Sequence, residues 1–482
     1  MAARTGEEFL KGLKARPREV WLGDERVADV TEHPALAGPA RTLAEVFDRQ
    51  HDFADECLMA NPITGDPMNV SHMIPASRDD LRRRHRGLRR IAEATVGLMG
   101  RTPDYMNVTF AGFAGELDAW LGPGGGNEEG AANLRAFQQD LARDDICLTH
   151  TIIHPTIDRV ADTRFAGNPV PLHKVAETAD SIVVRGARIL ATLAPFADEL
   201  AVYPGHPLPS DAGDEYALSF SVAADAPGLV FLCRDSTTAA GAERFDRPLS
   251  VRFDEQDAFV VFDDVEIPRS RVFIDGSRDV YNSVMMRSWY PNIMQQTTIR
   301  ALTKLEFAYG LASLLAEAVN DTSPHTLEML GELQGYVEVT RSAVLLAEEH
   351  SQDNGSGVWF PDGRPLHPMR ALLATWFPRV NEILLTIGSH NLLAAPTRGM
   401  LDDARLRPLL EEFLHGAPGF DADRRSALYR LAWDFVGSGL AARNELYERN
   451  YLMSARSNRV LAHVMADRAE PYRLVEQILE RG

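Results

Sequence analysis

Cysteine and long apolar stretches are both scarce in this sequence. Only Cys57, Cys147 and Cys233 occur in 482 residues, and their spacing suits neither a disulfide framework nor a metal site. We interpret each as a small buried apolar side chain. No apolar run approaches the roughly 20 residues needed to cross a membrane, and the N-terminus lacks the apolar core of a signal peptide. A cytoplasmic protein without a membrane partner is therefore expected.

Positive charge is also in short supply. The sequence has 50 Lys and Arg residues against 69 Asp and Glu residues, a formal net charge of −19 at pH 7. Such a chain repels nucleic acids and anionic membrane surfaces, so neither is expected as a partner. An acidic protein can still hold a basic pocket, and the charge does not exclude an anionic cofactor.

Nucleotide-binding glycine motifs are missing as well. Residues 122–127 are rich in glycine, but no predicted strand precedes them and their spacing differs from that of the dinucleotide fingerprint. The sequence contains no P-loop. We interpret 122–127 as a flexible connector.

The hydrophobic pattern divides the chain into three regions. Residues 1–146 are predicted to form an N-terminal helical domain, because apolar residues recur at three- and four-residue spacing in 40–51 and 79–99. Residues 147–277 contain short apolar runs separated by Asp, Gly and Pro, which is typical of an antiparallel β-barrel or sandwich. Residues 278–482 return to the helical period and are predicted to form a C-terminal bundle. Its long helices are expected at 302–319, 326–350, 369–393 and 424–451. Their apolar residues on more than one side indicate either an oligomer interface or simple internal burial.

One helix junction places a cation and a phenol on a rigid corner. Gly100 is predicted to end a helix, and Thr102 followed by Pro103 is typical of the start of the next one. Arg101 then lies in the joint and Tyr105 in the first turn. This pair could grip a polar substrate group. The alternative is a capped junction whose arginine forms a surface ion pair.

Several motifs, in order along almost the whole chain, carry a resemblance to a known family. They are 4–9, 99–105, 148–150, 158–159, 184–188, 252–257, 304–307 and 439–451. With these motifs the sequence resembles the oxygenase component of two-component, reduced-flavin-dependent phenol monooxygenases, the 4-hydroxyphenylacetate 3-hydroxylase family. The resemblance implies a mainly α, acyl-CoA-dehydrogenase-like fold: an N-terminal helical domain, a central β-barrel and a C-terminal four-helix bundle. Flavin binds there between barrel and bundle, without a Rossmann motif.

The resemblance also implies a reaction and its partners. A separate NAD(P)H:flavin reductase supplies FAD as FADH2 by diffusion, and O2 converts it to a C4a-hydroperoxyflavin. That species hydroxylates a para-substituted phenol ortho to its hydroxyl group. The family resemblance further implies a homotetramer assembled through the C-terminal bundle.

The family's residues for the substrate hydroxyl match Arg101, Tyr105 and His150. An imidazole suits a general base for the phenol, an arginine stabilises the phenolate, and a tyrosine hydroxyl orients it. His150 and His154 are four residues apart, but Pro155 favours extended backbone there, so we do not expect a metal site.

The resemblance also points to residues that contact the flavin. Thr192 could donate to the edge of the isoalloxazine, and Arg159 and Arg456 could meet the pyrophosphate. A solvated loop is the alternative for 454–457. The complete set of expected flavin contacts is His150, Thr151, Ile152, Thr156, Ile157, Asp158, Arg159, Thr192, Ser454, Ala455, Arg456 and Ser457.

The sequence departs from the family where the substrate tail binds. Hydroxyl side chains hold the tail carboxylate in the arylacetate enzymes, whereas Gly205 and His206 occupy the matching positions here. We therefore expect a substrate-binding loop that accepts a larger, neutral or carrier-bound tail.

Three other functions have to be weighed against this one. The 4-hydroxybutyryl-CoA dehydratases share the implied fold but need an iron–sulfur cluster held by three Cys and one His, and 99–103 contains no Cys and 289–304 no His. An acyl-CoA-dehydrogenase-like flavin enzyme would need a carboxylate base over the flavin. A non-catalytic helical binding protein would form no complex with reduced FAD.

Overall fold

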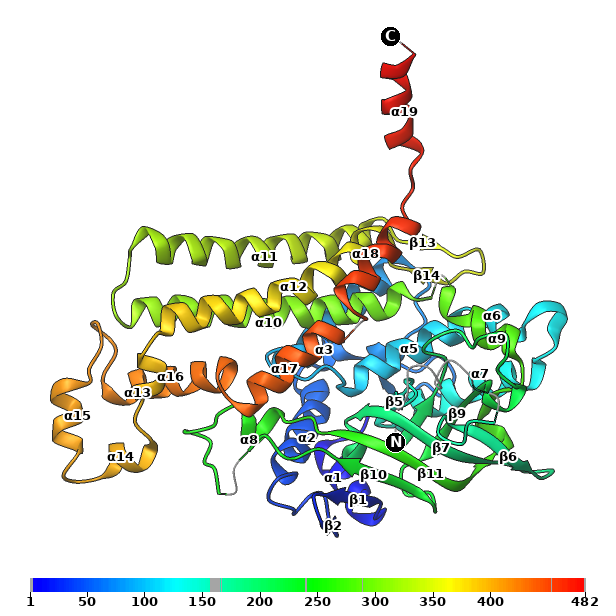
Figure 1. Ribbon diagram of the computed structural model, residues 1–482, viewed down its shortest axis with the longest axis horizontal. Coiled ribbons are helices and arrows are strands. Elements are labelled where there is room, and N and C mark those ends of the chain that lie inside the picture. The colour runs from blue at the N-terminus through cyan, green and yellow to red at the C-terminus, as the bar shows by residue number, and fades with distance from the viewer. Residues whose placement is uncertain are drawn as a thin grey trace.

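The computed structural model describes residues 3–156, 165, 167–238, 241–287, 289–451 and 453–480. Within them the chain runs from helices through strands to helices again, which confirms the expected order of elements (Figure 1). No described helix is both long and apolar enough to cross a membrane.

The N-terminal region contains seven α-helices and two short β-hairpins. The helices are α1 (Gly6–Ala15), α2 (Ala37–Asp52), α3 (Ala54–Cys57), α4 (Arg78–Ala94), α5 (Pro103–Gly115), α6 (Asp118–Leu121) and α7 (Glu128–Asp144). The strands are β1 (Glu19–Leu22), β2 (Glu25–Val27), β3 (Leu58–Ala60) and β4 (Pro67–Asn69). A capping box between Thr5 and Glu8 starts α1.

The junction between α4 and α5 differs in part from its prediction. The predicted start of α5 at Pro103 is correct, although the Thr102 side chain makes no capping bond to the backbone. The predicted end of α4 near Gly100 is wrong, because the helix ends at Ala94 and Gly97 adopts a φ of 70°. A Cβ at Gly97 would lie 2.5 Å from the Arg300 carbonyl oxygen, so a close tertiary approach decides where the chain turns.

The central region forms two sheets. One has six strands in the order β2-β1-β10-β11-β7-β6, and the other has four in the order β12-β9-β8-β5. Among the described residues no strand pairing joins the two sheets, so the structure does not show the closed barrel that the resemblance implies. The strands are β5 (Leu148–Thr151), β6 (His173–Glu177), β7 (Ser181–Thr192), β8 (Glu199–Val202), β9 (Leu218–Ala223), β10 (Leu229–Cys233), β11 (Asp257–Pro268) and β12 (Val272–Asp275).

The two sheets share an apolar core. Val184, Val260 and Phe262 of the larger sheet pack in one buried cluster with Val202 and Phe220 of the smaller sheet. The rings of Phe220 and Phe262 meet edge to face with centroids 6.1 Å apart. Two strands from the N-terminal region, β1 and β2, extend the larger sheet at one edge, since β1 pairs in parallel with β10.

The C-terminal region is dominated by three long helices. α10 (Pro291–Glu317), α11 (Pro324–Glu349) and α12 (Gly363–Gly388) lie side by side (Figure 1). The predicted helix 424–451 is two helices, because Ser438 caps a new helix directly after Gly437. The remaining helices of the chain are α8 (Ser250–Phe253), α9 (Arg278–Ser283), α13 (Asn391–Ala394), α14 (Arg398–Asp402), α15 (Arg407–Phe413), α16 (Ala422–Val436), α17 (Gly439–Asn450), α18 (Ala455–Val464) and α19 (Ala469–Leu479). A two-stranded hairpin of β13 (Gln352–Asp353) and β14 (Trp359–Phe360) joins α11 to α12.

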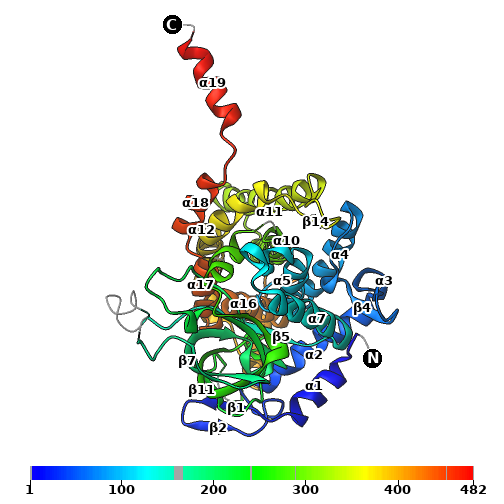
Figure 2. The ribbon, with the colours of Figure 1, turned by 90° about the vertical axis from the view of Figure 1, so that its right-hand side faces the viewer.

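The last helix is separate from the rest of the molecule. α19 stands clear of the body in two perpendicular views (Figures 1 and 2), and all its residues are exposed. Several of them are large and apolar, among them Leu474, Val475 and Ile478. Among the residues that the structure describes, none buries the apolar face of this helix.

Candidate active site

The corner at Gly100 and Arg101 is held by a carboxylate from a distant part of the chain. Glu255, which precedes β11, accepts hydrogen bonds from the backbone N–H of Gly100 at 2.9 and 3.0 Å and of Arg101 at 3.0 Å. The same carboxylate is ion-paired with Arg443 of α17 at 2.8 Å. The hydroxyl of Tyr451 donates to the Gly100 carbonyl at 2.9 Å. The β region and the C-terminal helices therefore fix this backbone together.

The Arg101 side chain is a buried cation surrounded by aromatic rings. Its Cζ atom lies 4.1 Å from the ring centroid of Tyr105 and 4.4 Å from that of Tyr451, and the residue is only 8% exposed. Its Nη1 donates to the Gly100 carbonyl at 3.3 Å, and within the described part of the chain it has no ion-pair partner, since nearby Glu255 pairs with Arg443. A buried charge without a counter-ion is costly, so this guanidinium favours an anionic oxygen beside it.

Strand β5 places the His150 ring beside Tyr105. The two rings are stacked with centroids 5.4 Å apart, and the ring of Tyr203 stacks on His150 at 5.3 Å. His150 Nδ1 is buried and has no hydrogen-bond partner among the described residues. Burial, and then the charge of Arg101, hold the pKa of His150 well below its usual value of 6.5. The imidazole is therefore neutral at pH 7 and free to accept a proton.

Three tyrosines that we did not single out complete this group. The Tyr203 side chain lies beside that of Tyr105, and Tyr447 and Tyr451 pack ring to ring at 4.8 Å beside Arg101. Burial raises the pKa of Tyr203, Tyr447 and Tyr451, so these phenols stay protonated at neutral pH. Tyr447 and Tyr451 belong to the motif 439–451, which was the available signal, whereas nothing in the sequence indicated that Tyr203 would contact His150.

The expected flavin contacts around β5 are only partly accounted for. We expected the Thr192 hydroxyl to donate a hydrogen bond to the flavin ring. In this structure it donates to Asp257 at 2.6 Å instead. Thr156 is exposed, and the Ile152 carbonyl accepts a hydrogen bond from Arg188 at 3.1 Å. The three remaining positions of this stretch lie outside the described residues: Ile157, Asp158 and Arg159.

Residues 454–457, which we expected to contact the flavin, form the start of a helix. Ser454 caps α18 by accepting the backbone N–H of Ser457 at 3.2 Å. Ala455 opens the helix, and Arg456 is exposed to solvent. This segment follows Tyr451 closely in the sequence, and its cap is exposed.

The surroundings of His150 nevertheless fit a flat amphipathic ring. The Thr151 hydroxyl is buried without a hydrogen-bond partner among the described residues. Ile153 pairs with Ile189, and these two and Leu190 are 41 to 44% exposed. Ile153, Ile189 and Leu190 thus form an exposed apolar surface, the apolar shelf, next to unpartnered polar atoms. This combination suits an isoalloxazine, whose edge carries hydrogen-bonding groups and whose faces are apolar.

The loop after Tyr203 leaves no room for a side chain at its centre. A Cβ at Gly205 would lie 2.6 Å from the Ile152 carbonyl oxygen and 3.1 Å from the Ile152 Cβ. His206 is exposed and interacts electrostatically with His154. A hydroxyl side chain at 205 would therefore need the Ile152 backbone to move.

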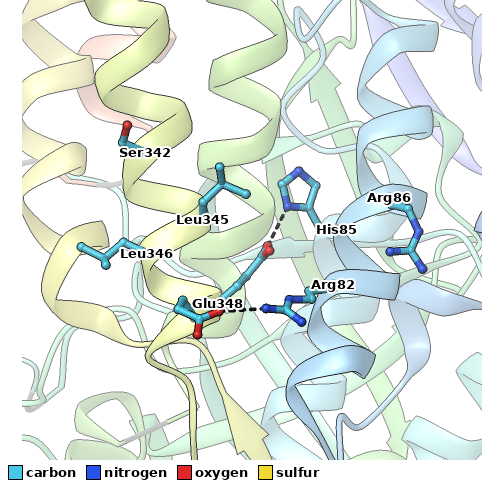
Figure 3. Close-up of a pocket in the computed structure, with 8 residues that line it drawn as sticks. Arg82, His85, Arg86, Ser342, Leu345, Leu346 and Glu348 are labelled. Atoms are coloured by element: carbon cyan, nitrogen blue, oxygen red, sulfur yellow. Dashed lines mark hydrogen bonds and ion pairs between the residues drawn. The ribbon is translucent and has the colours of Figure 1, made fainter.

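A surface groove elsewhere on the molecule does not belong to this group. It has a volume of about 710 Å³ and lies between α4 and α11, lined by Arg82, His85, Arg86, Ser342, Leu345, Leu346, Glu348 and Glu349 (Figure 3). His85 Nδ1 meets Glu348 at 2.7 Å, and Arg82 pairs with Glu349 at 2.8 Å. None of its lining residues touches Arg101, Tyr105 or His150 in the contacts described above, so we assign the chemistry to the buried group.

Comparison with known proteins defines the class first. The fold is that of the oxygenase component of a flavin-dependent aromatic monooxygenase. The chain matches a crystal structure of the oxygenase component of 4-hydroxyphenylacetate 3-monooxygenase complexed with FAD and 4-hydroxyphenylacetate. The match has a TM-score of 0.92 and 33% identity and covers 99% of each chain. The oxygenase component of 4-hydroxyphenylacetate 3-monooxygenase from Thermus thermophilus is 38% identical over 451 residues, 93% of this chain and 91% of that protein.

A further relative acts on a carrier-bound substrate. A Streptomyces globisporus monooxygenase named for a (3S)-3-amino-3-(3-chloro-4-hydroxyphenyl)propanoyl group on a peptidyl-carrier protein is 32% identical over 471 residues, 95% of this chain and 86% of that protein. The family descriptions "4-hydroxyphenylacetate 3-hydroxylase N terminal" and "4-hydroxyphenylacetate 3-hydroxylase C terminal" match residues 5–274 and 281–480. The chain therefore belongs to the 4-hydroxyphenylacetate 3-hydroxylase family.

Proposed function

We propose that this protein hydroxylates a para-substituted phenol ortho to its hydroxyl group, using FADH2 and O2. The observation that carries the proposal is the buried guanidinium of Arg101, which lacks a carboxylate partner among the described residues and lies beside the neutral ring of His150 and the hydroxyl of Tyr105. A cation, a base and a hydrogen-bond donor in contact with one another are what binding and ionising a phenol requires.

The protein's own residues prepare the substrate ring for oxidation. Arg101 would hold the phenolate oxygen by charge, and Tyr105 would donate a hydrogen bond to it. His150 would accept the phenol proton, and a phenolate next to Arg101 offsets the charge that lowers the pKa of His150. Loss of the proton makes the carbon ortho to the oxygen electron-rich. Bound reduced FAD, together with O2, supplies the electrophilic oxygen atom.

The same group would exclude water from the reacting atoms. Tyr203 stacks on His150, and Tyr451 covers Arg101, so both are shielded by apolar ring faces. Exclusion of water strengthens the interaction between Arg101 and a phenolate and protects the reduced flavin from side reactions.

The flavin would be held where the apolar shelf and the unpartnered atoms meet. Thr151, Ile152 and Thr156 border this place from the β5 side, and the backbone around Thr192 borders it from β7. We propose that 454–457 also contribute contacts to the cofactor. A separate NAD(P)H:flavin reductase would deliver FADH2 by diffusion, because the chain lacks a nicotinamide-binding motif.

The substrate tail is proposed to differ from that of 4-hydroxyphenylacetate. Gly205 and His206 supply no pair of hydroxyl groups for a short carboxylate, and the contact of Gly205 with Ile152 prevents a simple replacement. A larger, neutral or carrier-bound tail suits such a loop. The Streptomyces globisporus relative shows that carrier-bound substrates occur among similar proteins.

The proposed assembly is a homotetramer built through the C-terminal helices. Its support is the set of exposed large apolar side chains on these helices, which include Leu345, Leu346, Leu385, Val460 and Ile478. The isolated position of α19 also favours a partner chain (Figure 2). Light scattering at micromolar concentration checks this proposal, and a monomer would contradict it. The cytoplasmic location stays a prediction.

The experiment that tests the function combines the purified chain with any NADH:flavin reductase, FAD and a phenol. We expect a catechol that carries one atom of ¹⁸O2, detected by mass spectrometry, and no product when the reductase is omitted. Rapid NADH oxidation by the chain alone, in step with hydroxylation, would contradict the two-component assignment. Absence of any catechol over a panel of 4-substituted phenols would contradict the phenol hydroxylase itself.

A further inference from the structure

A second buried cation lies near the proposed site without a counter-ion. Arg188, on β7, is fully buried, and its Nη1 donates to the Ile152 carbonyl at 3.1 Å. Its Nε and Nη2 atoms are buried and complete no hydrogen bond within the described part of the chain. The hydroxyl of Tyr281, on α9, is the polar side-chain group beside it. The proposed mechanism does not use this guanidinium.

The unsatisfied atoms of Arg188 form one edge of its guanidinium group. Nε and Nη2 present two parallel N–H groups, and a carboxylate binds this edge with both oxygens. A neutral hydroxyl or amide would accept a hydrogen bond from only one of these N–H groups and would not neutralise the charge of the guanidinium. The geometry of the unpartnered atoms therefore favours a carboxylate over a neutral ligand.

His154 adds an unpartnered imidazole to the same place. Both of its ring nitrogens are buried without hydrogen-bond partners among the described residues. Burial, followed by the charges of Arg188 and His206, lowers the pKa of His154 to about 2. His154 is therefore neutral, faces both of these residues, and can donate one N–H to an anion held by Arg188.

This cluster lies along the same extended segment as the phenol site. Ile153 pairs with Ile189 of β7, so the backbone stays extended beyond β5. Side chains alternate in extended backbone, which puts His150, Ile152 and His154 on one side of it. At about 3.3 Å per residue, the Cα atoms of His150 and His154 are about 13 Å apart.

We propose that Arg188 and His154 form a binding site for a carboxylate at the end of the substrate tail, so that the substrates are para-substituted phenols whose tail is several bonds long and ends in an anion. The proposal rests on the proposed phenol hydroxylation and names its substrate class. The phenol binds at Arg101 and His150, the tail runs past Ile152 and Gly205, and its carboxylate reaches the free edge of Arg188.

The same geometry accounts for the glycine in the loop. Gly205 packs against the Ile152 carbonyl, so a side chain at 205 would displace the extended segment along which the tail runs. In 4-hydroxyphenylacetate a single methylene separates the ring from the carboxylate, which keeps the anion near His150 and far from His154. Poor use of 4-hydroxyphenylacetate is then a matter of tail length and not of charge.

The test compares kcat/KM for acid and amide pairs of increasing tail length, from 4-hydroxyphenylacetate to 4-hydroxyphenyl acids with several more methylenes. In the wild type, the longer acids are expected to be better substrates than their amides by roughly ten- to a hundredfold. Arg188→Met should bring this ratio close to one, and Arg188→Lys should retain part of it. The matched control is Arg185→Met, because Arg185 lies on the same strand, is half exposed and pairs with Asp263 and Asp264.

The outcomes separate this inference from the function on which it rests. Absence of 4-methylphenol hydroxylation in the wild type would contradict the phenol hydroxylase assignment, because this neutral phenol has no tail to bind. Equal kcat/KM for acid and amide at every tail length in the wild type would overturn the carboxylate site, even if Arg188→Met fails to fold. An unchanged acid preference in Arg188→Met, together with weaker binding of reduced FAD, would also overturn it and assign the guanidinium to the cofactor.

Discussion

The two ends of the proposed substrate site differ in how completely the chain supplies their contacts. At the phenol end, Tyr105 contacts both Arg101 and His150, and Glu255 fixes the backbone at Arg101. At the tail end, Gly205 offers no side chain and Arg188 keeps two unpartnered donors. The side chains proposed to ionise the phenol are therefore already positioned by contacts within the chain. The proposed choice of phenol depends instead on the donors of Arg188, which a bound substrate would satisfy.

The largest effect is expected when the base is removed from the phenol end. His150→Ala should lower the hydroxylation rate by roughly 10²- to 10⁴-fold, the usual contribution of a general base. Oxidation of reduced FAD by O2 should continue, so H2O2 release should rise as catechol formation falls. Because the pKa of His150 is held well below 6.5, the wild-type rate should stay level from pH 9 down to about pH 6 and fall only at lower pH.

The control for this change is His415→Ala, since His415 lies exposed in a loop far along the chain. Equal hydroxylation rates for the wild type and His150→Ala across this pH range would show that His150 is not the base.

Removal of the cation should have the next largest effect. Arg101→Met is expected to lower kcat/KM by about 10²- to 10³-fold, as for loss of a group that stabilises an oxyanion. The free energy of unfolding should not fall, because the substitution removes a buried charge that has no ion-pair partner among the described residues. The direct measurement is the visible phenolate band of bound 4-nitrophenol, which should be stronger in the wild type than in the variant at the same pH. An identical degree of ionisation would rule out charge stabilisation by Arg101.

The tail end should give a smaller difference and can be tested without a variant. A missing contact to a charged group costs about 1.5–3 kcal/mol, so free 4-hydroxyphenylacetate should be used roughly ten- to a hundredfold less well than longer or carrier-bound analogues. The panel includes tyramine, tyrosine esters, carrier-tethered tyrosyl groups and long-chain 4-hydroxyphenyl acids. If 4-hydroxyphenylacetate had the highest kcat/KM of all, the interpretation of Gly205 and His206 would be wrong, while the phenol hydroxylase would stand.

The smallest effect is expected inside the phenol end itself. Tyr203→Phe keeps the ring that stacks on His150 but removes the hydroxyl beside Tyr105, and loss of one hydrogen-bonding group costs about 0.5–1.5 kcal/mol. We expect kcat/KM to fall by up to about tenfold, mainly through kcat, because Tyr105 loses its orientation rather than its contact with substrate. Tyr216→Phe is the control, since its hydroxyl donates to the Asn168 carbonyl. A larger loss than for His150→Ala would show that Tyr203 itself touches the reacting atoms.

The parts of the structure that local sequence determines were predictable. Thr102 followed by Pro103 marks the start of α5 correctly, because the fixed φ of proline acts at that position alone. The end of α4 was not predictable, since Gly97 turns where the backbone meets α10. The strand runs left both a barrel and a sandwich open, because such runs reveal strands but not which strands pair.

The same distinction holds for the site. Arg101, Tyr105 and His150 were recognised from family motifs, and the structure brings them into contact. Tyr203 was not recognised, and Arg188 was given no role although it lies in the motif 184–188, because the importance of both comes from what they touch after folding. A tyrosine in a loop and an arginine in a strand have no local signature of such a role.

The carboxylate of Glu255 links parts of the chain that are far apart in sequence. It is 155 residues from Gly100 and 188 from Arg443, and it bonds to both. Contacts of this range require long loops to close before they stabilise anything, so they form late during folding. A nascent or partly folded chain therefore contains all the proposed catalytic side chains but not the contacts that position them, so catalytic competence should arise only in the last steps of folding.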